Sequence, residues 1–400
     1  MGQVARSWDV IVVGAGPGGS TAAYDLAQAG AEVLLLDRAQ FPRDKPCGGG
    51  VLLSAVKLLP YSLDPVTEQT ITSFRVRYKR RWEFEHHYDA PLAIMTQRAR
   101  LDAYMVDQAA GVGAEFRDAS AVRSIDNTTL TLANGDSHSA SVIIAADGAN
   151  GIVRRALGLP RLRGAVALEG NAARAASSGV ADPGDRWTDA VGLELGSVPG
   201  GYGWVFPKGD HCNVGVGGYP AAASTLKREL GLYAACESFD GSTLTNLRAH
   251  HLPLRDPDST LLHGPVAFIG DAAGLVDPLS GEGIGNAIRS AQLAVQSALE
   301  CLHGDASDLS GYEHAVLAEI EPELRVARQL QALFQQTPWP YVQLLRRSER
   351  FWGAFCRIVR GESTYTSFQN RLGPAKAVVD AAASLAARRE RRGASWQTED

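Results

Sequence analysis

Short apolar runs, each ended by a glycine-containing turn, recur along the chain and predict buried strands. The clearest runs are residues 9–13 (DVIVV), 141–146 (SVIIAA) and 266–269 (VAFI), and a helical pattern follows each of them. Apolar strands that alternate with helices are typical of a parallel sheet covered by helices. In such folds ligands bind beyond the carboxyl ends of the strands. We therefore expect a binding site where these three runs end.

The first turn has the spacing of a dinucleotide-binding loop. Gly14, Gly16 and Gly19 separate the first strand from a helix, and Asp37 ends the next strand. In such a unit the glycines permit a tight turn, the approach of a pyrophosphate and close packing of helix on strand. The acid accepts hydrogen bonds from a ribose, and the helix N-terminus favours the anion. These residues predict a dinucleotide site.

Two later turns repeat the combination of glycine and acid. Asp147 follows the second run in DGAN, and Asp271 follows the third in GDAAG. Residues 281–286 (GEGIGN) then lead into a helix, so their backbone N–H groups suit a negatively charged group. Structural acids at the strand ends are the alternative for Asp147 and Asp271.

Taken together, GAGPGG with Asp37-Arg38, ADGANG and GDAAGLVDPLSGEGIGNA resemble the three fingerprints of the p-hydroxybenzoate-hydroxylase-like FAD oxidoreductases. The resemblance implies bound FAD and a further FAD contact from Arg98 in QRARLD. It also places the N–H groups of Gly283, Ile284 and Gly285 beside N1 of a reduced flavin. No second GxGxxG follows a strand, so we expect an external reductant, either NAD(P)H or ferredoxin.

Two further segments concern the substrate. The first is PCGGG, with Cys47, Gly48 and Gly49, whose glycines let a flat ring or an apolar chain approach the backbone. In the second, PGGYGWVFP, Tyr202, Trp204 and Phe206 alternate, so a strand would present all three on one face. Such a row makes an apolar wall for a long substrate, although it is also compatible with sheet core.

PCGGG and PxxYxWxFP together resemble the geranylgeranyl reductase family, flavoenzymes that hydrogenate isoprenoid double bonds. The fold class implied is α/β: a Rossmann-like FAD-binding domain, an antiparallel-sheet substrate (cap) domain and a helical C-terminal region. We assign residues 1–70, 92–160 and 262–310 to the FAD-binding domain. Residues 71–91 and 161–261 are assigned to the cap, and 311–400 to the helical region.

The resemblance implies hydride transfer from flavin N5 to isolated C=C bonds of a polyprenyl chain on a lipid, quinone or diphosphate. Cys47, beside Lys45, is then a candidate proton donor to the other carbon. The main alternative is a flavin-dependent monooxygenase that hydroxylates or epoxidises an aromatic or terpenoid substrate, because such enzymes share the fold. A redox-neutral isomerase or cyclase and a non-catalytic flavin binder are further alternatives.

The composition limits the class of protein, its partners and its cellular location. The 400 residues are 45% hydrophobic and 21% charged with a net charge of −5, which fits a globular chain of several domains and disfavours nucleic acid as a partner. The five cysteines are scattered, so we expect neither disulfides nor structural zinc, and no other metal-ligand cluster is evident. No apolar run is long enough for a membrane span and no signal peptide is recognised, so a cytoplasmic protein is expected.

The C-terminal third is predicted to be helical. Residues 341–360 combine five arginines with an aromatic stripe, and two interpretations remain open. The helix either lies on an anionic membrane with its aromatic face inserted, a peripheral contact, or packs on the FAD-binding domain with its arginines in water. Residues 375–387 are predicted to form an alanine-rich helix.

Overall fold

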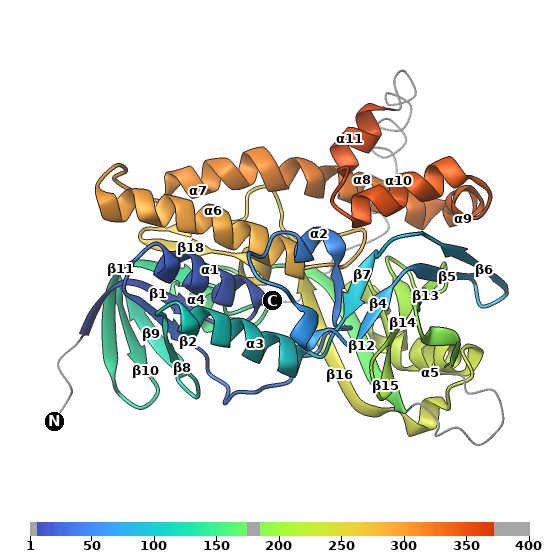
Figure 1. The fold of residues 1–400 in the computed structure, drawn as a ribbon, viewed down its shortest axis with the longest axis horizontal. Coiled ribbons are helices and arrows are strands. Elements are labelled where there is room, and N and C mark those ends of the chain that lie inside the picture. The colour runs from blue at the N-terminus through green and yellow to red at the C-terminus, as the bar shows by residue number, and fades with distance from the viewer. Residues whose placement is uncertain (1–5, 174–184, 372–400) are drawn as a thin grey trace.

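The computed structural model describes residues 6–173 and 185–371. Within these ranges two large sheets lie side by side, with helices packed along and above them (Figure 1). The alanine-rich helix predicted over 375–387 lies outside the described residues.

The first sheet contains the three apolar runs as central strands. Its strands are β1 (Arg6–Val13), β2 (Val33–Leu36), β8 (Glu115–Arg117), β9 (Val122–Asp126), β10 (Thr129–Leu132), β11 (Ser137–Ala145), β17 (Leu262–His263) and β18 (Val266–Phe268). They follow the order β17-β18-β11-β1-β2-β8, and β10 and β9 extend from β11. β1 pairs in parallel with β2 and β11, and β11 pairs in parallel with β18. The ends of these strands therefore meet at one edge, as the sequence predicted.

Helices cover this sheet. They include α1 (Pro17–Gln28), α3 (Arg98–Gly111), α4 (Ile152–Ala156) and α6 (Ile284–His303). α1 packs against both α3 and α6. The C-cap of α6 is Gly304, whose φ of 81° is the left-handed conformation that glycine adopts most easily.

The second sheet forms the cap. Its strands are β5 (Ser73–Tyr78), β6 (Trp82–His87), β12 (Gly164–Ala173), β13 (Ala190–Leu195), β14 (Tyr202–Pro207), β15 (His211–Gly218) and β16 (Thr245–Pro253). The order is β16-β12-β15-β14-β13-β5-β6, so β16 and β6 are its edges. α5 (Leu226–Cys236) packs on one face through Leu226, Leu230 and Tyr233. The expectation of an antiparallel sheet is confirmed except between β5 and β13, which run parallel because the β5–β6 hairpin joins the cap from a separate part of the chain.

A small sheet and short helical turns connect the two layers. The small sheet consists of β3 (Gly50–Leu52), β4 (Gln69–Ile71) and β7 (Ala93–Met95), and α2 (Leu53–Val56) follows β3. The 3₁₀ turns are Asp64–Val66, Asp185–Trp187, Pro220–Thr225, Gly241–Thr243 and Gly270–Ala273.

The C-terminal helices lie above both sheets (Figure 1). They are α7 (Ser310–Ala315), a π-helical turn (Val316–Ile320), α8 (Glu321–Gln336), α9 (Pro338–Arg347), α10 (Glu349–Val359) and α11 (Tyr365–Asn370). Among the described residues, none of the helices is both long and apolar enough to cross a membrane. The predicted fold class, including the helical C-terminal region, is confirmed.

The segment 341–360 differs from the prediction of one helix. It is interrupted at Ser348, whose extended backbone ends α9 and whose Oγ accepts a hydrogen bond of 3.2 Å from the backbone N of Phe351 in α10. The aromatic face of α10 packs on the cap: the rings of Trp352 and Phe355 lie 5.9 and 5.4 Å from that of Phe74. The aromatic face of α10 is therefore covered by the cap sheet and is not free to insert into a membrane. The alternative of a helix packed within the protein is confirmed in part, because α10 packs mainly on the cap and also contacts α2 in the region assigned to the FAD-binding domain.

Candidate active site

The turn between β1 and α1 is built for close backbone packing. Gly14 has a φ of 103°, and a Cβ there would lie 2.4 Å from the carbonyl oxygen of Ala146. A Cβ on Gly19 would lie 1.8 Å from the carbonyl oxygen of Gly14. Gly16 is the N-cap of α1 and provides no side chain to cap it. Because no side chain caps this helix start and Gly16, Pro17 and Gly18 line the cavity, the positive end of α1 suits a pyrophosphate.

A chain of buried ion pairs lies beside this turn. Asp37 accepts a hydrogen bond of 2.9 Å from the backbone N of Ala15, and Arg43 bridges Asp37 (3.4 Å) and Asp102 (2.8 Å). Asp102 in turn holds Arg98 through two hydrogen bonds of 2.8 and 2.7 Å. Burial is the largest single effect on the pKa of Arg98 and lowers it, but the charges of Asp102 and Cys47 and the hydrogen bonds to both side chains together outweigh burial, so the net pKa is raised. Arg98 is thus fixed as a cation at the cavity wall.

Of the remaining predicted cofactor residues, Asp271 lines the cavity, whereas Asp147 and Arg38 are not among its lining residues. Asp271 lies in the cavity wall, 3.6 Å from the Nζ of Lys45. Asp147 instead accepts a hydrogen bond of 2.8 Å from the backbone N of Val153 in α4, and its Oδ1 is buried without a partner. Burial raises the pKa of Asp147 to about 6. Arg38 is exposed.

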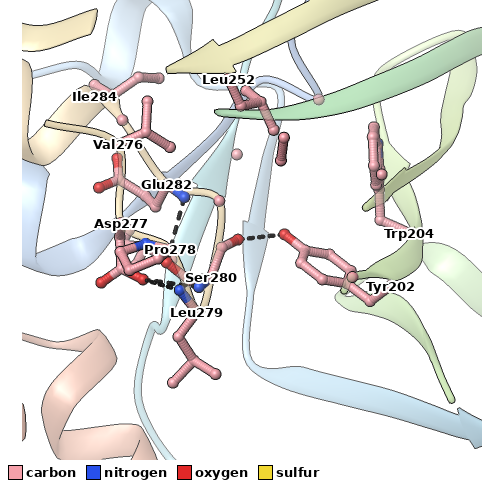
Figure 2. A pocket seen from close by; sticks show the side chains of 18 of the residues that line it. Tyr202, Trp204, Leu252, Val276, Asp277, Pro278, Leu279, Ser280, Glu282 and Ile284 are labelled. Atoms are coloured by element: carbon pink, nitrogen blue, oxygen red, sulfur yellow. Dashed lines mark hydrogen bonds between the residues drawn. The ribbon is translucent and has the colours of Figure 1, made fainter. Parts of the chain in front are cut away.

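The turn before α6 is held by its own carboxylates (Figure 2). Asp277 accepts hydrogen bonds of 2.8 Å from the backbone N atoms of Leu279 and Ser280. Glu282 accepts one of 2.7 Å from the backbone N of Gly285, in the first turn of α6. Burial raises the pKa of Glu282 to about 7. Gly283 is the N-cap and Ile284 the first residue of α6. The backbone N–H groups of Gly283, Ile284 and Gly285 therefore lie at the start of a helix, as predicted.

Tyr202, Trp204 and Phe206 lie on one face of β14, as their alternation predicted. The ring centroids of Tyr202 and Trp204 are 6.0 Å apart, and those of Trp204 and Phe206 are 6.3 Å apart. The Tyr202 hydroxyl donates a hydrogen bond to the carbonyl oxygen of Ser280, which joins the row to the turn before α6 (Figure 2). The Trp204 Nε1 donates one of 2.8 Å to Asn213, so its polar atom is satisfied within the cap.

The glycines of PCGGG pack against this aromatic row. A Cβ on Gly48 would lie 2.5 Å from the ring of Phe206. Gly49 has a φ of 68°, and a Cβ there would lie 2.1 Å from the carbonyl oxygen of Thr96. Both positions therefore exclude larger residues, and the loop and the row form one wall.

Three ionisable residues of the site were not predicted from the sequence, and two of them, Glu169 and Lys208, lie at the loop that carries Cys47. Glu169 accepts a hydrogen bond of 2.7 Å from the Cys47 backbone N, and Lys208 donates one of 2.8 Å to the carbonyl oxygen of Thr96 and another to that of Gly48. His250 lines the cavity from β16. Burial raises the pKa of Glu169 to about 7 and lowers those of Lys208 and His250 to about 8 and about 4.

His250 and His251 are adjacent in β16, so strand alternation turns their side chains to opposite faces and places His250 at the cavity. His251 faces the other way, with its Nε2 3.0 Å from the carbonyl oxygen of Leu162. Glu169 and Lys208 have no comparable local pattern. Within the described ranges, no group of three His, Cys, Asp or Glu side chains is arranged to hold a metal ion.

A cavity of about 640 Å³ joins these features. At one end its walls are the first glycine turn, Arg98, Asp271 and the turn before α6. Its middle is lined by PCGGG and the aromatic row, and its far end by apolar side chains of the cap and of the C-terminal helices, including Phe74, Leu193, Phe334, Leu345, Trp352 and Phe355. The C-terminal helices, to which sequence analysis assigned no role in the site, therefore form its roof.

The comparisons with known proteins agree with this geometry. The family model described as "FAD binding domain" matches residues 7–176. A menaquinone reductase of Mycobacterium tuberculosis is 32% identical over 327 residues, covering 74% of this chain and 77% of that protein. The chloroplastic geranylgeranyl diphosphate reductase of Nicotiana tabacum is 28% identical, covering 83% and 76%. A digeranylgeranylglycerophospholipid reductase of Methanopyrus kandleri is also 28% identical, covering 81% and 89%.

Solved structures support the fold. A geranylgeranyl bacteriochlorophyll reductase-like protein of Thermoplasma acidophilum has a TM-score of 0.73 at 23% identity, covering 83% of this chain and 88% of that one. The flavin-dependent brominase Bmp2 has a TM-score of 0.75 at 16% identity, covering 96% and 100%. At these identities the likeness concerns fold alone. With the curated relatives and the shared motifs, the chain belongs to the geranylgeranyl reductase family of FAD-dependent oxidoreductases.

Proposed function

We propose that this enzyme hydrogenates isolated C=C bonds of a polyprenyl chain carried by a lipid, a quinone or a diphosphate. The observation that carries the proposal is a cavity that joins the dinucleotide-binding turns to a space lined by apolar side chains. An apolar space suits a chain of isoprene units, whereas the polar end can accept a ring system and its charge.

The residues at the polar end fit FAD. The bare N-terminus of α1 and the Gly14–Gly19 turn suit the pyrophosphate, because any Cβ on Gly14 or Gly19 would collide with backbone. Asp37 suits the adenosine ribose, and Arg98, Asp271 and the N–H groups at the start of α6 line the space beyond it. Reduced FAD, when bound, supplies the hydride, and NAD(P)H or ferredoxin is the proposed external source of its electrons.

The protein's own contribution is position and exclusion of water. An isolated alkene has no carbonyl group to take up electrons, so its two carbons must be held where hydride and proton can both arrive. Tyr202, Trp204 and Phe206 form the wall that holds the chain, and Gly48 and Gly49 keep that wall free of side chains. Cys47 borders the same space and is our candidate proton donor.

Anaerobic turnover tests the proposal. The purified flavoprotein is reduced with dithionite, and a geranylgeranyl lipid, menaquinone or geranylgeranyl diphosphate is added while the flavin absorbance is followed. Reoxidation with a product heavier by one pair of hydrogens per event is expected, and the rates rank the head groups. Reduced flavin that persists until oxygen enters, followed by an oxygenated product, would instead identify a monooxygenase.

Variants of the aromatic row test its role. Phe206→Ala and, separately, Trp204→Ala should lower the rate of alkene reduction roughly 10- to 100-fold, because a chain held loosely reacts slowly. The FAD content per protein should stay unchanged. Leu232→Ser, on the opposite side of the cap and 44% exposed, is the control. Loss of FAD from both aromatic variants would show that the row is sheet core.

A further inference from the structure

Exposed apolar side chains gather at one edge of the cap. We call Trp82 (55% exposed), Trp339 (40%) and Leu344 (45%) the rim patch. The rings of Trp82 and Trp339 lie 5.9 Å apart, and that of Tyr78 lies 5.2 Å from Trp339. Two exposed tryptophans in contact are unusual on a protein surface and indicate an interaction site.

The rim patch adjoins the cavity. α9 runs beside the edge strand β6, where the Nε2 of His86 lies 3.1 Å from the carbonyl oxygen of Arg346. Leu344 is exposed and also lines the cavity, together with Tyr341 and Leu345 of the same helix. The apolar end of the cavity therefore reaches the surface at the rim patch.

Five exposed cations lie near the patch residues in the chain. They are Lys79, Arg81, Arg346, Arg347 and Arg350, none of which forms an ion pair with another described residue. The Nζ of Lys79 lies 5.5 Å from the ring of Tyr78, and that ring in turn packs against Trp339.

The acids of this region are fewer. Glu83 and Glu85 are both paired with arginines: Glu83 with Arg77, and Glu85 with Arg75 at 2.8 Å. Within residues 73–89 and 338–360, the other exposed acids are Asp89 and Glu349. Although the whole chain carries a net charge of −5, its charge near the rim patch is positive.

We propose that the rim patch docks on an anionic lipid bilayer, so that a polyprenyl chain passes directly from the bilayer into the cavity. Tryptophan rings lie favourably at the bilayer interface, and each lysine or arginine near an anionic surface adds to the attraction. The passage of the chain rests on the proposed function, but the docking surface does not. This surface differs from the aromatic face of α10, which is buried.

Flotation with vesicles tests the docking. The FAD-loaded full chain is mixed with vesicles of phosphatidylcholine alone or with phosphatidylglycerol added. We expect binding to the anionic vesicles that weakens with salt. Trp82→Ser with Trp339→Ser, and separately Arg346→Glu with Arg347→Glu, should each weaken binding roughly tenfold or more. The matched control is Leu232→Ser with Leu247→Ser, which removes two leucines that are 44% and 47% exposed elsewhere on the cap.

The outcomes are distinct. Binding that is absent, or that survives both rim variants, overturns the proposal. A dimer of the wild type that the tryptophan variant dissociates, without vesicle binding, assigns the patch to a second copy and also overturns it. All variants should keep their FAD and reduce a detergent-solubilised substrate at the wild-type rate. If no substrate is ever reduced, the proposed function fails, while the vesicle result still decides the docking.

Discussion

The carboxyl group of Glu169 lies behind the loop that carries Cys47, where burial changes its protonation. Glu169 is 8% exposed, and burial raises the pKa of its carboxyl group to about 7 from an ordinary value of 4.5. Because the folded pKa is the higher one, this group stabilises the folded state fully below the unfolded pKa. The contribution is lost as the pH rises through the folded pKa.

Glu169→Gln isolates this contribution, because the amide oxygen can still accept the hydrogen bond from Cys47. From about pH 5.5 to about pH 8, the wild type should lose about 2 kcal/mol more of its unfolding free energy than the variant does. Denaturant unfolding at several pH values measures both curves. Parallel curves would mean that Glu169 titrates alike in the folded and unfolded chains.

At the scale of the element, α10 stabilises the cap and closes the cavity. Trp352 is 4% exposed, stacks 5.2 Å from His86 and donates a hydrogen bond of 3.1 Å to the carbonyl oxygen of His87. Trp352→Ala should lower the unfolding free energy by about 3–5 kcal/mol, since it leaves a large hole at the contact with the cap. The exposed Arg350→Ala on the same helix should change it by less than about 0.5 kcal/mol. Equal losses in denaturant unfolding would contradict this packing.

At the scale of the whole molecule, one cavity spans the FAD-binding domain, the cap and the C-terminal helices. Ligands at its two ends should therefore protect different segments from hydrogen exchange. We expect FAD to slow exchange in residues 14–20 and 281–287, and a long prenyl lipid to slow it additionally in β14, α9 and α10. Mass-spectrometric exchange with a short prenyl alcohol is the control. Lipid protection confined to the FAD end would show that the chain does not enter the far end.

Several features of the site could be predicted from the sequence because they depend on residues close together in the chain. The Gly14–Gly19 turn follows from a strand, a glycine pattern and a helix in direct succession. The aromatic row follows from the alternation of Tyr202, Trp204 and Phe206 in a single strand. Both involve contacts whose geometry is set within a few residues.

Only the tertiary structure decided which distant residues meet. The amphipathic pattern of α10 specified an apolar face but not the surface that it covers, and long-range packing placed Trp352 on the cap. Glu169 and Lys208, far from Cys47 in the sequence, carry no local pattern that predicts their place beside it. Periodicity therefore determined the elements and their faces, whereas the roof of the cavity and the charges around Cys47 arose from the assembly of those faces.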